Sequence, residues 1–330
     1  MRGLGADGRL AGLASTVLVL ALLGVGGGLA RSGRTAVSEG PWDVTVGPDR
    51  VRPGEFVAVV VTGAGVDGEP EGWSGELAGQ RFGFYPAGQG RVAALVAVSY
   101  HQEPGAYPLA VRAPSGREVR LTLPVEPRDF EVQRLTVPPS QEALVRPRDP
   151  EAIERQRREA EEVAAARARS SPQPRWDGPF VWPLDGARRI TSEFGLMREV
   201  NGRVTERHSG LDLAAPAGTP VRAANAGRVV LAREHMVTGK TVILDHGWGL
   251  FTSYLHLSSM AVQEGQLVRK GQVIGQVGST GFSTGPHLHW AAWVPRAFVD
   301  PRRLLEGGRW PPELLSVARL RAAAALQQEA

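Results

Sequence analysis

Apolar residues along this chain occur mostly in short runs of strand length, and glycine and proline separate the runs. The first half contains such runs at residues 57–61, 91–98 and 119–123, and the last of these alternates apolar and polar positions. Pro-Gly and Ser-Gly turn signals punctuate them at short spacing. Several short strands with regular turns predict an N-terminal β-sandwich domain of immunoglobulin-like type over residues 41–137.

A second region of strands and turns extends from residue 180 to about residue 305. Its expected strands include Val221 and the runs 227–231, 241–244, 252–256, 273–274 and 287–290. The glycines expected to form turns between them are Gly265, Gly271, Gly278, Gly281 and Gly285. The fold class predicted for the whole chain is therefore mainly β, with two β domains.

One segment between the two domains, residues 151–169, has the composition of a helix. The pairs that would support it at i,i+4 spacing are Glu151–Arg155 and Glu154–Arg158. Its apolar positions are limited to Ile153, Val163 and alanines, so we interpret residues 150–170 as a solvated helical connector rather than a core element. A short C-terminal helix is expected at 312–330.

The N-terminus carries the features of a targeting segment. Arg2 and Arg9 precede an uncharged, largely apolar run from Leu10 to Ala30. Residues 1–30 fit both a cleaved secretory signal peptide and an uncleaved membrane anchor, and the sequence leaves this choice open. In either case, we expect the rest of the protein to lie outside the cytoplasm, in the periplasm or cell envelope.

Composition narrows the chemistry that is available. The chain has no cysteine, so any bound metal must be held by His, Asp or Glu side chains. Its formal net charge of +4 over 330 residues is modest and is compatible with an anionic surface such as a cell wall. No basic stripe with interleaved aromatic residues is present, so we expect no nucleic-acid partner.

Four of the seven histidines, together with one aspartate, lie in glycine-flanked apolar motifs. His208 and Asp212 occur in HSGLD, His256 in SYLHL, and His287 and His289 in GPHLHW. In an extended segment, side chains two or four residues apart point to the same face. We therefore expect the HSGLD pair and the HLH pair each to present both polar side chains to one point.

This set of side chains suits a zinc site with an open coordination position. Zinc accepts imidazole and carboxylate ligands in a tetrahedron, and three protein ligands leave one position for water. A zinc-bound water loses its proton near neutral pH and becomes a nucleophile, and a nearby imidazole can orient it, take its proton or stabilise an oxyanion. Five candidates for three ligand positions leave two for this second role, which favours a hydrolase over a structural zinc site.

The remaining histidines have local explanations. His101 lies beside a turn and is expected to be exposed, and so is His235, which follows the charged pair Arg233-Glu234. His246 is explained by a hairpin turn.

Three segments of the second domain resemble the lysostaphin-type zinc metallo-endopeptidases of bacterial cell walls. They are HSGLDLAAPAGTPVRA at 208–223, HGWGLFTSYLHL at 246–257 and GSTGFSTGPHLHW at 278–290. The segment VWPLDGARRITSEFG at 181–195 is similar to the family's usual first strand. The resemblance covers about residues 180–305, and the N-terminal β domain is only loosely similar to accessory domains of such enzymes.

The resemblance assigns roles by position. It implies that His208, Asp212 and His289 bind one zinc ion per chain. His287 and His256 would form the catalytic pair, with the roles of base and oxyanion stabiliser not divided between them. The implied substrates are peptide bonds of peptidoglycan, so we predict a zinc-dependent endopeptidase that hydrolyses peptidoglycan cross-links.

The alternative is a non-enzymatic regulator of the cell wall or of cell division that uses the same domain as a binding groove, because some relatives lack the ligands. The N-terminal β domain could dock a cell-wall or cell-division protein. A further hypothesis is that the helix at 151–169, or the β domain, covers the groove in the full-length chain.

Overall fold

The structure is a computed structural model that describes residues 35–38, 42–63, 65–186 and 189–306. The predicted targeting segment at 1–30 and the predicted helix at 312–330 lie outside these residues. Within the described part of the chain, no helix is both long enough and apolar enough to cross a membrane.

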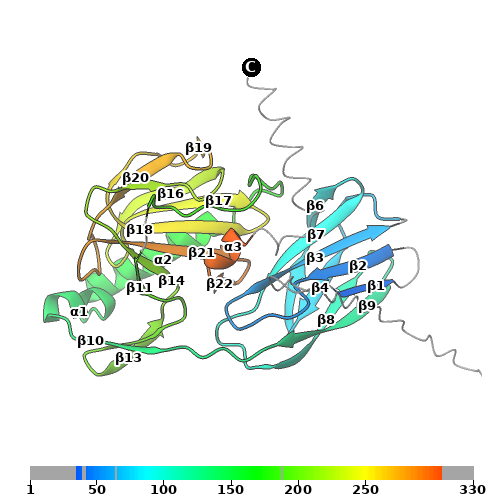
Figure 1. The fold of residues 1–330 in the computed structure, drawn as a ribbon, viewed down its shortest axis with the longest axis horizontal. Helices are drawn as coiled ribbons and strands as arrows, with labels where there is room; N and C mark the ends of the chain where they lie inside the picture. Colours follow the sequence, from blue (N-terminus) through cyan, green and yellow to red (C-terminus); the bar gives the residue numbers. More distant parts are fainter. Residues whose placement is uncertain (1–34, 39–41, 64, 187–188, 307–330) are drawn as a thin grey trace, which may run out of the picture.

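The N-terminal part is a sandwich of two antiparallel sheets (Figure 1). The first sheet has the order β1 (Thr35–Ser38), β2 (Trp42–Gly47), β3 (Phe56–Gly63), β7 (Arg91–Ala97) and β6 (Tyr85–Gly88). The second has the order β5 (Gln80–Gly83), β4 (Ser74–Leu77), β8 (Gly105–Arg112) and β9 (Glu118–Val125). The predicted strands of this region are present, while the immunoglobulin-like assignment stays a prediction.

The strand β3 is apolar on both faces because each face packs against a different core. Val57, Val59 and Val61 enter the core between the two sheets of the sandwich. The alternate residues Ala58 and Val60 enter the core of the second domain. The central strand β7 also contributes alternate residues to the two cores. Both strands are therefore apolar at nearly every position. The strand β9 alternates apolar and polar residues because one of its faces is in solvent.

The second part is built on a sheet whose main path has the order β11 (Arg189–Ser192), β14 (Gly210–Ala214), β21 (His287–Val294), β18 (Leu250–Met260), β17 (Gly239–Gly247), β16 (Gly227–His235) and β19 (Leu267–Val268). The strands β15 (Pro220–Arg222), β20 (Val273–Val277) and β22 (Ala297–Val299) join at its side, and α3 (Arg302–Leu305) follows. All strands predicted from residue 221 onward are present.

The two faces of this sheet differ in character, as β21 shows. Leu288 and Trp290 are fully buried in the main core, as expected for positions that alternate with the HLH histidines. His287, His289 and Trp293 lie on the opposite face, by the same alternation. We call this opposite face, which also carries Phe251 of β18, the histidine face.

Ion pairs join the sandwich to the second part, in addition to the shared core. Arg128, which follows β9, contacts Asp300 at 2.7 Å, and Arg303 of α3 contacts Glu55 of the sandwich. Both carboxylates are almost completely buried. The sandwich is therefore held in a defined position against the second part.

The segment between the two parts adds a strand and two helices. β10 (Val132–Leu135) pairs in parallel with β12 (Met197–Val200), which pairs in turn with β13 (Arg203–Arg207). The helices are α1 (Pro139–Val145) and α2 (Pro150–Arg167). The Asp149 side chain caps α2 by accepting a hydrogen bond from Ala152 N at 3.0 Å, with a proline at the first helical position.

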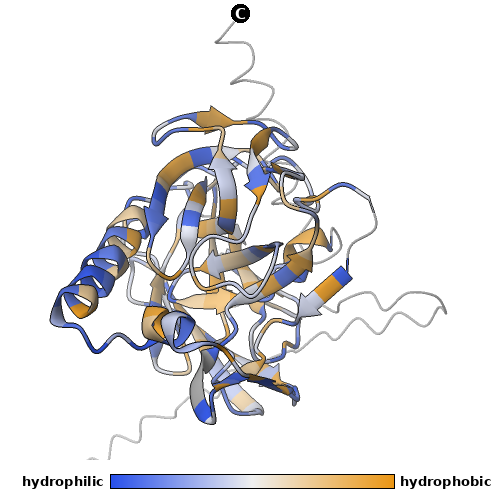
Figure 2. Cartoon of the chain, turned by 90° about the vertical axis from the view of Figure 1, so that its left-hand side faces the viewer, coloured by the Kyte–Doolittle hydropathy of each residue, from blue (hydrophilic) through white to orange (hydrophobic). Residues whose placement is uncertain are grey.

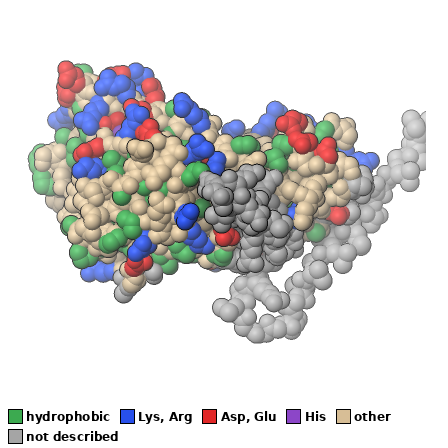
Figure 3. All heavy atoms as spheres, turned by 90° about the horizontal axis from the view of Figure 1, so that it is seen from above, with side chains coloured by type: hydrophobic (Ala, Val, Ile, Leu, Met, Phe, Trp, Pro, Cys, Tyr) green, Lys and Arg blue, Asp and Glu red, His purple; other side chains and the backbone are tan. Residues whose placement is uncertain are grey.

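The helix α2 confirms the predicted helical segment. Of the predicted pairs, Glu154 and Arg158 have a charge interaction, but the short ion pairs of the helix join other partners. Arg155 pairs with Glu159, and Arg157 pairs with Glu154 and Glu161. Figure 2 shows that α2 is mostly hydrophilic. Charge is similarly mixed elsewhere, since Arg and Lys are interspersed with Asp and Glu on the face seen in Figure 3.

His246, at the end of β17, should make stability depend on pH. It is fully buried; its Nδ1 donates to Ala226 O and its Nε2 accepts from Thr252 Oγ1, both at 2.7 Å. Burial lowers the pKa of His246 from 6.5 to about 4. Below pH 6.5 the unfolded chain therefore binds a proton that the folded chain does not, and stability falls as the pH drops toward 4, by on the order of 3 kcal/mol.

This effect can be isolated by urea denaturation of zinc-free protein between pH 7 and pH 4.5. The stability advantage of the native chain over a His246→Gln variant should shrink as the pH falls through this window. A His101→Gln variant, changed at an exposed histidine, should keep the native pH dependence. A constant difference between the native chain and His246→Gln would contradict the assignment.

Candidate metal centre

Three side chains meet at the edge of the histidine face. His208 lies between β13 and β14, Asp212 lies on β14, and His289 lies on β21. The antiparallel register places Asp212 directly opposite His289. His208 Nε2, Asp212 Oδ1 and His289 Nδ1 are each 2.9 Å from the other two atoms. These atoms form the one group of metal-competent donors found among the described residues.

The route by which His208 reaches this point differs from the prediction. We expected His208 and Asp212 to lie on one extended strand, but β14 begins only at Gly210. At this glycine, a Cβ atom would lie 2.4 Å from Trp290 O and 2.8 Å from His289 Nε2. The glycine of HSGLD is therefore required by a close approach of β14 to β21.

The outer nitrogens of the two imidazoles are occupied by protein acceptors. His208 Nδ1 donates to Glu193 O at 2.8 Å, and His289 Nε2 donates to Ser209 Oγ at 3.4 Å. The inner nitrogens then present lone pairs toward the Asp212 carboxylate. Three acceptors at this spacing repel one another unless a cation lies between them.

The donor set fits zinc. Adjacent ligands of a tetrahedral ion with bonds of about 2.0–2.1 Å are about 3.3 Å apart, close to the observed 2.9 Å. Two neutral imidazoles and one carboxylate are also the ligand types that zinc prefers, and they leave one position open.

Burial and mutual contacts set the protonation of these ligands. Burial disfavours the charged form of Asp212, but in the absence of a metal the protonated forms of His208 and His289 donate to this carboxylate and, with their charge, hold the pKa of Asp212 well below its usual value. Burial lowers the pKa of His289 to about 4. At neutral pH the carboxylate is thus ionised and the His289 imidazole is neutral, the forms that bind a metal.

Two further histidines lie beside the three ligand candidates. The ring centroids of His256 and His287 are 4.8 Å apart, and His287 Nε2 lies 3.7 Å from Asp212 Oδ1. His256 Nδ1 donates to Thr280 O and His287 Nδ1 donates to Gly285 O, each at 2.8 Å. Both rings therefore keep Nε2 available to accept or donate a proton.

The backbone of His256 has a positive φ of 62°, an uncommon conformation for a non-glycine residue. It occurs where the pairing of β18 with its neighbours shifts register. Burial, followed by the nearby His289 and His287, lowers the pKa of His256 to about 3, so this ring is neutral at neutral pH.

The other histidines lie away from this centre. His101 is exposed, as predicted, and His246 is buried next to the β17–β18 turn. The prediction for His235 was wrong, because its side chain is only 6% exposed. Its Nε2 lies 3.2 Å from Glu162 Oε2 of α2.

Sequence reasoning also missed Arg198, which contacts the metal centre from β12. Its Nη2 donates to Asp212 Oδ2 at 2.5 Å, the carboxylate oxygen that does not face the imidazoles. No spacing rule links an arginine to a ligand 14 residues later on another strand, so only the structure identifies it.

The helix α2 packs on the histidine face itself. Its Val163 and Ala166 contact the buried cluster that the sheet forms there, and this cluster consists of Leu231, Ile243 and Phe251. The guanidinium of Arg167 lies 4.4 Å from the ring centroid of Trp293. Because Trp293 is four residues from His289 on one strand, the helix crosses this face about 13 Å from the metal centre.

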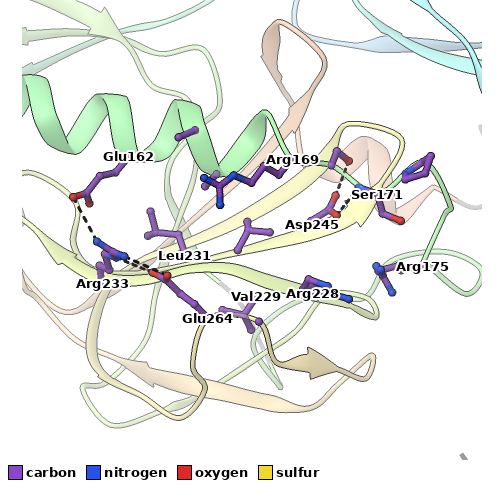
Figure 4. A pocket seen from close by; sticks show the side chains of 16 residues that line it. Glu162, Arg169, Ser171, Arg175, Arg228, Val229, Leu231, Arg233, Asp245 and Glu264 are labelled. Atoms are coloured by element: carbon purple, nitrogen blue, oxygen red, sulfur yellow. Dashed lines mark hydrogen bonds and ion pairs between the residues drawn. The ribbon is translucent and has the colours of Figure 1, made fainter.

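Two hollows border the helix. One, of about 940 Å³, lies between α2, the histidine face and Tyr85 and Tyr100 of the sandwich, and it extends to Ser209 beside His289. The other, of about 690 Å³, lies between α2 and β16 (Figure 4). There Arg233 pairs with both Glu162 and Glu264.

Comparison with known proteins identifies the second domain. The model of peptidase family M23 matches residues 206–301, which include all five side chains of the centre. A crystal structure of a putative peptidase M23 from Pseudomonas aeruginosa is 32% identical, with a TM-score of 0.56, and the match covers 79% of this chain and 96% of that one. This chain belongs to peptidase family M23. The resemblance inferred from the motifs and the mainly β fold class are thereby confirmed.

Curated relatives match over about a third of this chain. Peptidoglycan DD-endopeptidase ShyB of Vibrio cholerae is 43% identical over 122 residues, which are 36% of this chain and 28% of that protein. DD-carboxypeptidase/endopeptidase Mpg of Neisseria meningitidis is 44% identical over 113 residues, which are 34% and 26% of the two chains. The chain thus spans little more than a quarter of the length of these relatives.

Proposed function

We propose that this chain is a zinc-dependent endopeptidase that hydrolyses the peptide cross-links of bacterial peptidoglycan. The observation that carries the proposal is the complete His-Asp-His donor set, with two accessory histidines, within an M23 domain. The names of the peptidoglycan-cleaving relatives support the substrate class. A purely regulatory M23 domain has no need for intact ligands, so the donor set disfavours the regulator as the alternative.

In this proposal His208, Asp212 and His289 hold the zinc ion, which when bound supplies a Lewis acid and lowers the pKa of water. His256 and His287 lie on the open side of the centre with Nε2 available. They serve as the base that takes a proton and as the group that stabilises the oxyanion.

The remaining parts receive roles in the same proposal. Residues 1–30 act as a signal peptide or membrane anchor, which places the protein outside the cytoplasm where peptidoglycan is. The catalytic domain extends over residues 180–305. The β-sandwich at 41–137 positions this domain and can dock a cell-wall or cell-division protein.

The test is digestion of purified sacculi with mass spectrometry of the released fragments. The zinc-loaded protein should release fragments cut at a peptide bond of the cross-links, because the bound ion is needed to activate water. Treatment with a chelator should stop the release, and stoichiometric zinc should restore it. Intact sacculi after incubation with fully zinc-loaded protein would favour the regulator instead.

We also propose that α2 covers the substrate groove in the full-length chain. Its apolar contacts with the histidine face support this, as does its attachment to the β16–β17 turn, where Glu159 Oε2 accepts from Met236 N at 2.8 Å. α1 contacts the loop before β21, since Gln141 Nε2 donates to Ser283 O at 3.0 Å. The two helices therefore contact two adjoining loops, one of which accepts a hydrogen bond from His256 N through Thr238 O.

A further inference from the structure

Arg198 is the one described cation that contacts a carboxylate of the metal centre. Its guanidinium is partly buried, and Asp212 is almost completely buried. A carboxylate has two oxygens that can bind a metal, and here they have separate partners. Oδ1 faces the two imidazoles, whereas Oδ2 accepts from Arg198.

This division has a consequence for the metal. A carboxylate whose second oxygen is free can turn and bind an ion through both oxygens, which would fill the open position. A hydrogen bond from a charged guanidinium to Oδ2 opposes that turn. It also fixes the orientation of Oδ1 before the metal arrives, as partners of ligands commonly do.

Arg198 is itself held by the segment that links the two domains. Its Nε donates to Gln133 Oε1 at 3.3 Å, and Gln133 Nε2 donates to Ser192 Oγ at 3.2 Å. Gln133 lies on β10, directly opposite Arg198 in the parallel pairing with β12. A chain of side-chain contacts thus runs from the interdomain strand to the metal centre.

We propose that Arg198 is a positioning residue that holds Asp212 as a one-oxygen zinc ligand, and that Gln133 of β10 orients Arg198 for this task. This inference rests on the proposed zinc site, but it concerns metal binding and does not require that the chain cleave peptidoglycan. It also makes the interdomain strand part of the metal centre, so a truncated chain that starts near Pro172 should bind zinc more weakly than the full chain.

The test is the zinc dissociation constant of the full-length chain, measured by competition with a chromophoric chelator. Arg198→Gln should weaken zinc binding at least ~10-fold, the usual effect of removing a partner of a metal ligand. Arg198→Lys should recover part of the loss because it keeps the charge, and Gln133→Ala should cause a smaller loss than Arg198→Gln.

The matched control is Arg134→Gln, since Arg134 lies on β10 and pairs with Glu199 of β12 at 3.3 Å without contacting the centre. A second measurement is the visible spectrum of the cobalt-substituted protein, which reports ligand geometry. It should change in Arg198→Gln and stay unchanged in Arg134→Gln. Circular dichroism of the zinc-free variants checks that they fold.

Zinc affinity in folded Arg198→Gln equal to that of the native chain would overturn the inference, and so would an equal loss in Arg134→Gln. Weakened zinc binding in Arg198→Gln, together with a native chain that leaves sacculi intact, would instead retain the inference and reject the proposed function.

Discussion

Replacing His289 with alanine should abolish peptidoglycan cleavage and reduce zinc binding at the same time. The substitution removes one of three donors, each 2.9 Å from the others, and leaves His208 and Asp212 as an incomplete pair. A catalytic metal contributes several kcal/mol of transition-state stabilisation, so we expect a loss of at least ~10³-fold in the rate of sacculus digestion. Zinc content after dialysis, measured by atomic spectrometry, should fall in parallel.

The two accessory histidines should behave differently from the ligands. His256→Ala and His287→Ala should lose activity but keep one zinc per chain. The Nδ1 atoms of both histidines are hydrogen-bonded to backbone carbonyls, and neither residue belongs to the His208–Asp212–His289 donor group. His101→Ala, an exposed histidine, is the matched control and should retain both activity and zinc. Full activity in His289→Ala would remove the basis of the proposed function.

The strands, and the grouping of the five candidate side chains, could be predicted because their signals are local. Alternation along β21 places Leu288 and Trp290 on one face and the two histidines on the other, and this requires only the extended conformation. The origin of a continuous apolar run is harder to predict. β3 is apolar on both faces because it packs against two domains, and a single sequence does not identify the second partner.

The errors have a common physical cause, which is contact between segments distant in sequence. His235 follows two charged residues, so its surroundings in sequence suggest exposure, but α2 covers it from 73 residues earlier. Arg198 reaches Asp212 from a neighbouring strand with no characteristic spacing. The weak apolar stripe of α2 indicated a solvated helix, and the helix has no buried residue. The stripe did not indicate that Val163 packs against the histidine face.

A substitution that displaces α2 from the histidine face should increase the rate of sacculus digestion. Val163→Asp would replace the apolar contact with Leu231, Ile243 and Phe251 by a carboxylate, with Arg167, one turn later on α2, as its neighbouring cation. The apolar contact is lost and a carboxylate is partly desolvated at this half-buried position, so the helix should leave the histidine face more often. Removing about 2 kcal/mol from the covered state would raise the population of the open state, and the rate of sacculus digestion, by up to ~30-fold.

The substitution is a sharper test than removal of residues before Pro172, because that truncation would also delete β10 and its contact with Arg198. The matched control is Ile153→Asp, which introduces the same charge on the same helix at a side chain that is 51% exposed. It should leave the rate unchanged. Arg167→Ala, which removes the contact with Trp293 without adding a charge, should produce a smaller increase. If folded Val163→Asp digested sacculi no faster than Ile153→Asp, α2 would be a structural support of the sheet and not a cover.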